Sequence, residues 1–148
     1  MPQTPDTVLF ACSRNLVRSP MAEALLKARM GDRIFVDSCG ARVPAEHETA
    51  MGADPLMCEV MAEIGCDLTG HRPKTFAQLE DASFDLVISF TPEAQHRALE
   101  MARGRAVEIE YWPIYDPTLT EGSREARLAA YRAVRDTLAA RIAERFGD

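Results

Sequence analysis

Near the N-terminus lies the stretch Thr7-Val-Leu-Phe-Ala-Cys12-Ser-Arg-Asn-Leu-Val-Arg18-Ser-Pro-Met-Ala-Glu-Ala-Leu-Leu26. Residues 8–11 are a continuous apolar run, which is typical of a strand buried on both faces of a parallel sheet. Ser19-Pro20 suits the start of a helix, and Gly31 suits its end. The stretch therefore predicts a strand, a short loop and a helix, with Cys12 at the point where the strand ends.

The loop at residues 12–18 predicts a binding site for a tetrahedral anion. A loop that leads into a helix N-terminus gathers partly positive backbone N–H groups, and the Arg18 guanidinium offers a planar fork for two oxygens of the anion. The same positive field would hold Cys12 as a thiolate, which is the nucleophilic form. The predicted phosphate-binding residues are Ser13, Arg14, Asn15, Leu16, Val17 and Arg18.

A second Cys-x5-Arg pattern runs from Cys66 to Arg72. Pro73 follows Arg72 directly, and no apolar helix leaves this loop, so no ring of amide groups would face the Cys66 sulfur. We therefore predict a structural role for Cys66. The spacing of the four cysteines, without a Cys-x-x-Cys or cysteine–histidine cluster, favours free thiols and argues against a metal site.

The segment Cys12-Ser-Arg-Asn-Leu-Val-Arg-Ser-Pro-Met-Ala-Glu23 resembles the P-loop signature of the low-molecular-weight protein tyrosine phosphatase family, which also contains arsenate reductases of the same fold. Supporting similarity occurs at residues 37–40, 65–72, 84–89 and 116–117. The resemblance implies an α/β fold of three layers, in which helices flank a four-stranded parallel sheet with strand order 2-1-3-4. We expect residues 1–148 to form a single domain.

The resemblance also implies roles for individual side chains. Asp116, in the loop after the fourth strand, matches the general acid of the family, so the predicted catalytic residues are Cys12, Arg18 and Asp116. A hydrogen-bond network beneath the P-loop is matched here by Asn15, Ser19, Ser38 and His71. Asn15 has an independent reason to be in the loop, because a tight loop without glycine needs a residue that tolerates a positive φ.

Arg14 stands where the family usually has glycine. Its Cβ restricts the backbone, so either the local φ is negative or the loop is strained without an anion. The side chain has two alternatives: it points inward to the thiol, or outward to the rim, where it would contact the rest of an anionic substrate. We favour the outward orientation.

Hydrophobic patterns and helix-start signals place the remaining elements. The predicted strands are residues 34–39, 84–90 and 106–112, and the last of them alternates apolar and acidic residues as an edge strand does. The predicted helices are residues 55–64, 76–81, 92–102 and 123–146.

Composition limits the partners of the protein. A net charge of −6 gives no general attraction to nucleic acid or to an anionic membrane, so we predict neither as a partner. No stretch approaches the roughly 18 apolar residues of a membrane span, and the N-terminus lacks the features of a signal peptide. We expect a cytoplasmic protein that uses no cofactor and no metal.

The predicted activity is hydrolysis of a phosphomonoester through a cysteinyl-phosphate, with a phosphorylated small molecule or a phosphoprotein as substrate. Two departures from the resembling phosphatases argue against specificity for phosphotyrosine. The connection at residues 41–53 contains no aromatic residue, and Thr118 and Leu119 replace the aromatic residues that follow Asp-Pro in the family.

Arsenate reduction is the main alternative, because arsenate is tetrahedral and can form the same thiol ester. Trp112 and the missing aromatic walls favour this alternative. Since no cysteine follows Cys66, a reductase would need a small thiol such as glutathione or mycothiol as electron donor. A third hypothesis is a non-catalytic module that binds oxyanions or phosphoproteins, but the joint presence of Cys12, Arg18 and Asp116 argues against it.

Overall fold

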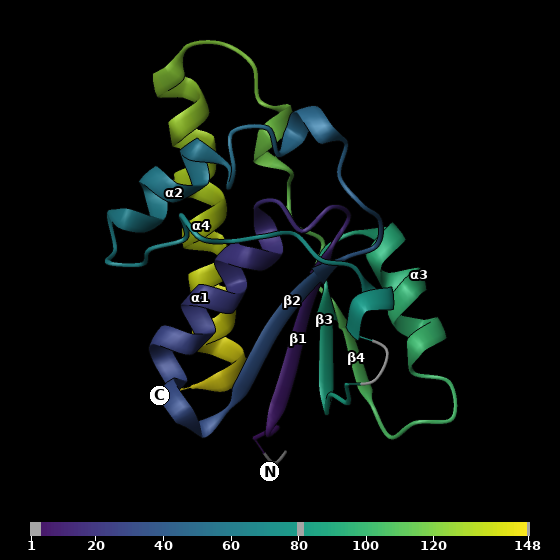
Figure 1. Ribbon diagram of the computed structural model, residues 1–148. Coiled ribbons are helices and arrows are strands. Elements are labelled where there is room, and N and C mark those ends of the chain that lie inside the picture. The colour runs from purple at the N-terminus through teal and green to yellow at the C-terminus, as the bar shows by residue number, and fades with distance from the viewer. Residues whose placement is uncertain (1–3, 80–81, 148) are drawn as a thin grey trace.

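The structure is a computed structural model that describes residues 4–79 and 82–147, and a parallel sheet lies at its centre (Figure 1). The strands are β1 (Thr7–Cys12), β2 (Phe35–Gly40), β3 (Leu86–Ser89) and β4 (Glu108–Tyr111). They lie in the order β2-β1-β3-β4, and every neighbouring pair is parallel. The predicted sheet and its strand order are confirmed.

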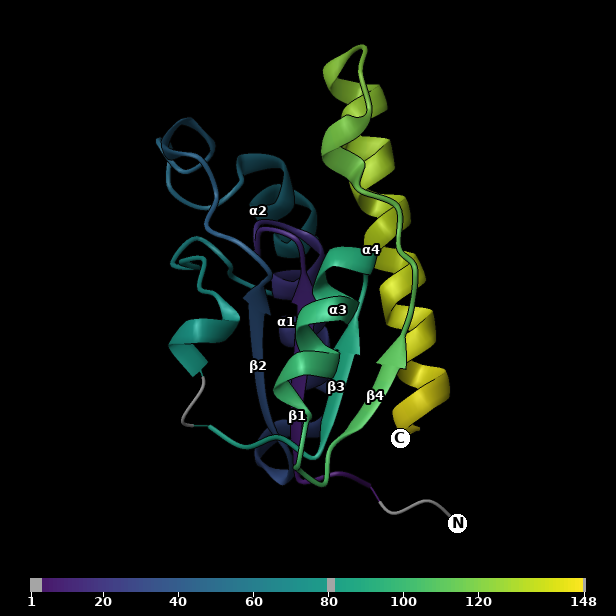
Figure 2. The same ribbon diagram turned by 90° about the vertical axis from the view of Figure 1, so that its right-hand side faces the viewer.

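Helices cover both faces of the sheet and give the three predicted layers (Figure 2). α1 (Arg18–Met30), α2 (Pro55–Ala62) and α4 (Arg124–Phe146) lie on one face, and α3 (Pro92–Met101) lies on the other. The alternating side chains of β1 divide between the two cores: Phe10 and Cys12 join the larger core, and Leu9 and Ala11 join the smaller one under α3. A strand buried on both faces explains the apolar run that the sequence shows.

Element boundaries differ from the predicted ones by a few residues. β3 and β4 are shorter than predicted, because they pair with each other only from Leu86–Glu108 to Ser89–Tyr111. β4 has no second neighbour in the sheet and is the predicted edge strand. The predicted helix at 76–81 is a 3₁₀ turn over Phe76–Leu79, and its last two residues lie outside the described part.

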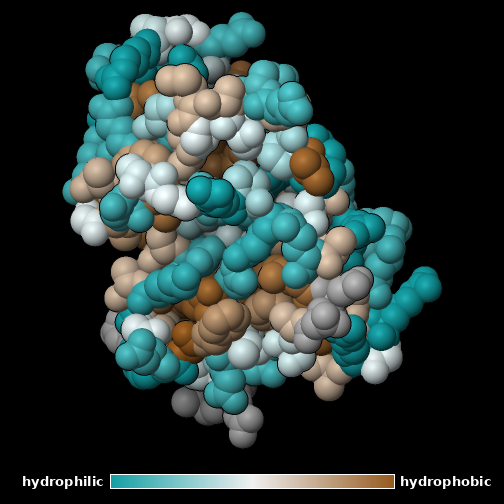
Figure 3. Space-filling model, in the orientation of Figure 1, coloured by the Kyte–Doolittle hydropathy of each residue, from teal (hydrophilic) through white to brown (hydrophobic). Residues whose placement is uncertain are grey.

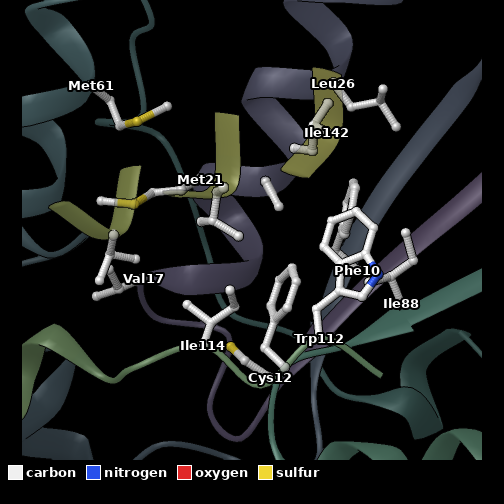
Figure 4. Packing of buried hydrophobic residues seen from close by; sticks show 14 of the residues in the cluster. Phe10, Cys12, Val17, Met21, Leu26, Met61, Ile88, Trp112, Ile114 and Ile142 are labelled. Carbon is white, nitrogen blue, oxygen red and sulfur yellow. The ribbon is translucent and has the colours of Figure 1, made fainter. Parts of the chain in front are cut away.

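The larger core extends up to the end of β1, where the P-loop begins. Figure 4 shows Cys12 beside Ile114 at the border of this core, with Phe10, Met21 and Trp112 farther in. Cys12 is 2% exposed and the packing around it is apolar on one side. The nucleophile candidate is therefore held by a rigid strand end.

The face seen in Figure 3 is mainly hydrophilic, with smaller hydrophobic patches in its lower half. Among the described residues, no helix combines the length and the apolar character needed to cross a bilayer.

Two short 3₁₀ turns stand beyond the carboxyl ends of the strands. They are η2 (Glu46–Glu48), in the connection after β2, and η4 (Pro117–Leu119), after β4. In Figure 2 they lie on either side of the loop between β1 and α1. Ligands of open parallel sheets bind at this end of the strands, so these turns form the walls of the expected site.

Candidate active site

The P-loop, residues 12–18, connects β1 to α1. Asn15 has a φ of 57°, and it is the only non-glycine residue with a positive φ in the described ranges. This is the conformation predicted for Asn15, and it means that Arg14 introduces no left-handed strain. Of the two alternatives for Arg14, a negative local φ or a strained loop, the structure has the first.

Gly40 ends β2 directly beneath the P-loop. A Cβ on Gly40 would lie 2.7 Å from the Arg14 carbonyl carbon and 2.8 Å from the Asn15 nitrogen, and both atoms belong to the backbone. Gly40 belongs to the supporting motif at residues 37–40, from which this role was not predicted. A glycine at the end of the strand beside the loop was the available signal.

We predict that Gly40→Ala disturbs the P-loop and weakens anion binding. The added methyl group has no space, and overpacking of this kind costs about 1–3 kcal/mol. Denaturant unfolding would measure the loss of stability, and a phosphate-binding assay would measure the loss of affinity. Gly70→Ala is the matched control, because a Cβ on Gly70 meets nothing within 4 Å. Equal behaviour of the two variants would show that the close approach at Gly40 is unimportant.

The Cys12 sulfur lies 3.0 Å from the hydroxyl oxygen of Ser19. Asn15 Nδ2 donates to that oxygen at 2.7 Å, so the Ser19 hydroxyl keeps its own hydrogen for another acceptor. A thiolate at Cys12 is the nearest acceptor for this hydrogen, since the Cys39 carbonyl oxygen lies 3.4 Å from the Ser19 hydroxyl. The helix begins at Arg18, before Ser19, so Ser19 faces the sulfur instead of capping the helix as its position suggested.

The network continues away from the site through Ser38. Asn15 Nδ2 also donates to Ser38 Oγ at 3.0 Å, and Ser38 donates to Glu23 Oε1 at 2.6 Å. Glu23 forms an ion pair with Lys27 one helical turn along α1. The side chains of Asn15, Ser19 and Ser38 are brought together as the resemblance implied, whereas the terminal acceptor Glu23 was missed.

His71 supports the P-loop from the other side. Its Nε2 lies 2.7 Å from the Asn15 carbonyl oxygen, and because a carbonyl only accepts, Nε2 carries the hydrogen. Burial lowers the pKa of His71, against the opposing effect of this hydrogen bond. His71 is therefore favoured as a neutral donor beneath the loop.

We predict that folding stability decreases as the pH falls below about 6.5, the ordinary pKa of histidine. Below that value the unfolded chain binds a proton that buried His71 resists, so protonation favours the unfolded state down to the lowered pKa of the folded state. One such group changes the free energy of unfolding by at most about 1.4 kcal/mol per pH unit.

Denaturant titrations at several pH values would test this effect. Below pH 6.5, the free energy of unfolding is expected to change less steeply with pH in His71→Gln than in the wild type. His96→Gln is the control, because His96 lies on α3 with its side chain 76% exposed. Identical slopes for the wild type and His71→Gln would refute the assignment to His71.

Arg18 and Asp116 meet at the mouth of the P-loop. Arg18 Nη1 donates to the Ile114 carbonyl at 3.0 Å, and Arg18 Nη2 lies 3.6 Å from Asp116 Oδ2. Asp116 Oδ1 accepts from the nitrogen of Thr118 at 3.0 Å and from its hydroxyl at 2.7 Å. One carboxylate oxygen thus fixes η4, and the other faces the anion site.

Arg14 spans the two walls of the site. Its Nη1 pairs with Glu48 Oε2 of η2. Its Nη2 lies 3.3 Å from both Asp116 Oδ2 and Thr118 Oγ1, on the side of η4. The side chain therefore lies across the mouth, as in the favoured outward orientation. Glu48 was missed, because nothing in its loop sequence indicates a partner so distant along the chain.

The space at the P-loop is small. Its volume is about 10 Å³, and it is lined by Cys12, Arg14, Leu16, Val17, Arg18, Asp116 and Thr118. A space of that size admits about one water molecule. Arg14, Arg18 and Asp116 are its charged lining residues, so the shape of the space depends on how these side chains are placed.

The thiols of Cys39 and Cys66 do not line this space. Cys39 is fully buried in the core under α3, and burial raises the pKa of its thiol. Cys66 packs against the larger core. Within the described ranges, no group of three or more histidine, cysteine or acidic residues could hold a metal ion.

A loop that carries a cysteine and an arginine at the carboxyl end of a parallel sheet with strand order 2-1-3-4 is typical of small enzymes that use a cysteine to act on oxyanions. The chain belongs to the low molecular weight phosphotyrosine protein phosphatase family, whose pattern it matches over residues 7–145. The family suggested by the resemblance is confirmed.

Relatives of both predicted activities are found. The chain is 31% identical to an arsenate reductase of Halalkalibacterium halodurans, over 91% of each chain. It is 34% identical to a low molecular weight protein-tyrosine-phosphatase of Streptomyces coelicolor, over 78% of this chain and 72% of the relative. Among solved structures, the tyrosine phosphatase Wzb of Escherichia coli K30, in complex with sulphate, matches with a TM-score of 0.72 and 25% identity, over 97% of this chain and 100% of that one.

Proposed function

We propose that this protein hydrolyses phosphomonoesters through a cysteinyl-phosphate on Cys12. The observation that carries the proposal is that Cys12, Arg18 and Asp116 line one small cavity, with a hydroxyl donor 3.0 Å from the sulfur. The matched family and its phosphatase members support the same reaction. The substrate is a phosphorylated small molecule or a phosphoprotein.

In the first step the Cys12 thiolate attacks phosphorus, the P–S bond forms and the ester P–O bond breaks. Arg18 and the amides of residues 13–18 hold the other phosphoryl oxygens as charge develops on them. Asp116 gives its proton to the leaving oxygen, so the alcohol departs neutral. The hydrogen bond from Ser19 stabilises the thiolate before attack.

In the second step water attacks the phosphoryl group and Asp116 takes its proton. The P–S bond then breaks, and its electron pair returns to sulfur as the thiolate. The Ser19 hydroxyl again donates to that sulfur, which makes Cys12 a better leaving group. Both steps use the same residues in the same place, as microscopic reversibility requires.

Arsenate reduction is the second candidate, favoured by the arsenate reductases among the relatives. Cys12 would form a thiol ester with arsenate, with loss of water. A small thiol would then attack the Cys12 sulfur, and the electron pair of the S–As bond would leave with arsenite. A second thiol would reduce the resulting mixed disulfide and restore Cys12.

One pair of assays separates the candidates. Turnover of an aryl phosphate is measured beside arsenate-dependent oxidation of glutathione or mycothiol, each with the wild type and Cys12→Ser. We expect Cys12-dependent phosphate release. Cys12-dependent arsenite formation without phosphate release would support the reductase instead, and anion binding without either reaction would support a binding module. The single domain over residues 1–148 and the cytoplasmic location stay predictions.

A further inference from the structure

Arg14 and Glu48 form a salt bridge across the mouth of the active site. We propose that this Arg14–Glu48 bridge selects the substrate, favouring compact oxyanions and slender phosphomonoesters over flat aryl esters such as phosphotyrosine. The inference rests on the proposed function and adds a substrate class to it. Glu48 acts in it as a positioning residue that holds Arg14.

The Glu48 end of the bridge is firmly held. Glu48 Oε1 accepts from the Ala45 backbone nitrogen at 2.9 Å, within its own turn, while Oε2 pairs with Arg14 Nη1. The side chains of Arg14 and Glu48 are only 20% and 17% exposed. A partly buried pair is screened less than a fully exposed ion pair.

The contacts that Arg14 makes on the side of η4 are weaker. Arg14 Nη2 lies 3.3 Å from Asp116 Oδ2 and from Thr118 Oγ1, which is longer than the usual 2.7–2.9 Å of a charge-assisted hydrogen bond. An entering anion therefore displaces Asp116 from Nη2, while Nη1 stays on Glu48. The exchange frees Asp116 Oδ2, which the proposed mechanism needs as the site of the acid proton.

The position of the bridge determines what else fits. After the exchange the guanidinium still stands between η2 and η4, where the group beyond the ester oxygen has to lie. Inorganic oxyanions and slender esters leave the bridge intact. A flat ring can enter only if the Arg14–Glu48 pair breaks, which leaves two charges partly buried without their partners.

Binding measurements on the Cys12→Ser background test the bridge without turnover. Calorimetry would give Kd for inorganic phosphate and for phosphotyrosine in this background alone, with Glu48→Gln and with Glu46→Gln. Gln at position 48 can still accept from Ala45, so the turn is kept while the charge is lost. Glu46→Gln removes the same charge from an exposed position of the same turn.

We expect the ratio of the phosphotyrosine Kd to the phosphate Kd to fall by about 5- to 10-fold in Glu48→Gln and to stay unchanged in Glu46→Gln. Equal ratios in all three proteins would overturn the proposal. Phosphotyrosine that binds none of them would overturn it as well, because opening the bridge should admit the ring.

The reactivity of Cys12 gives a second readout, in protein that retains the thiol. The rate at which neutral iodoacetamide alkylates Cys12 would be followed by peptide mass spectrometry. We expect this rate to be several-fold higher in Glu48→Gln and in Arg14→Met than in the wild type or in Glu46→Gln. Equal rates in all four would contradict a closed mouth. A wild type that turns over no phosphomonoester would refute the proposed function but would leave these binding and alkylation results unaffected.

Discussion

Cys12→Ser is expected to abolish turnover of a small aryl phosphate while phosphate still binds. A serine hydroxyl at neutral pH is a far weaker nucleophile than a thiolate, and loss of a catalytic nucleophile costs on the order of 10⁶-fold in turnover. The amides of the P-loop and Arg18 remain, so the anion site survives. Steady-state kinetics and calorimetry of phosphate binding would measure the two properties on the same preparation.

Cys66→Ser is the control for this prediction. Cys66 also begins a Cys-x5-Arg pattern, but it packs against the core and does not line the P-loop cavity. Activity should change little in this variant. Comparable losses in Cys12→Ser and Cys66→Ser would contradict the assignment of the nucleophile, and loss of phosphate binding in Cys12→Ser would point to a disturbed loop.

Much of the fold could be predicted because its signals are local in the sequence. The apolar run of β1, the helix start at the end of the P-loop and the Asp54-Pro55 start of α2 each depend on neighbouring residues. Boundaries were less certain, since the ends of β3 and β4 depend on which residues pair across the sheet. That pairing is a property of the folded chain, which a hydrophobic pattern does not contain.

The site was predictable where a residue belongs to the P-loop signature or its matched network. The residues that were missed act through contacts distant along the chain: Gly40 lies against Arg14, and Glu48 pairs with it. The glycine at the end of β2 indicates a close backbone approach but not its partner, and nothing in the sequence around Glu48 indicates Arg14. The replacement of glycine by Arg14 indicated that an additional charge stands near Cys12, but only the structure shows the carboxylates that hold it.

A buried network of this kind constrains the loop more than any single hydrogen bond does. Asn15 alone contacts Ser19, Ser38, the nitrogen of Lys74 and, through its carbonyl, His71. Its left-handed φ is therefore fixed from several directions before any ligand arrives. Such pre-organisation places the amide groups for the transition state without a cost at the moment of reaction.

Asp116→Asn is expected to lower turnover by about 10²–10⁴-fold for alkyl phosphates, but much less for a nitrophenyl phosphate. Asparagine keeps an oxygen that can accept from the Thr118 nitrogen, so η4 is retained. It has no proton to give, and a basic alkoxide needs that proton whereas a nitrophenolate does not.

The comparison between leaving groups also isolates the proton from the charge. Asp116→Asn removes a negative partner of Arg14 and Arg18, and this changes anion binding for both substrates alike. The effect cancels in the ratio of their kcat/KM values, so the ratio reports proton donation alone. Equal losses for both substrates would show that Asp116 acts only through its charge on Arg14 and Arg18, and that the general acid lies elsewhere.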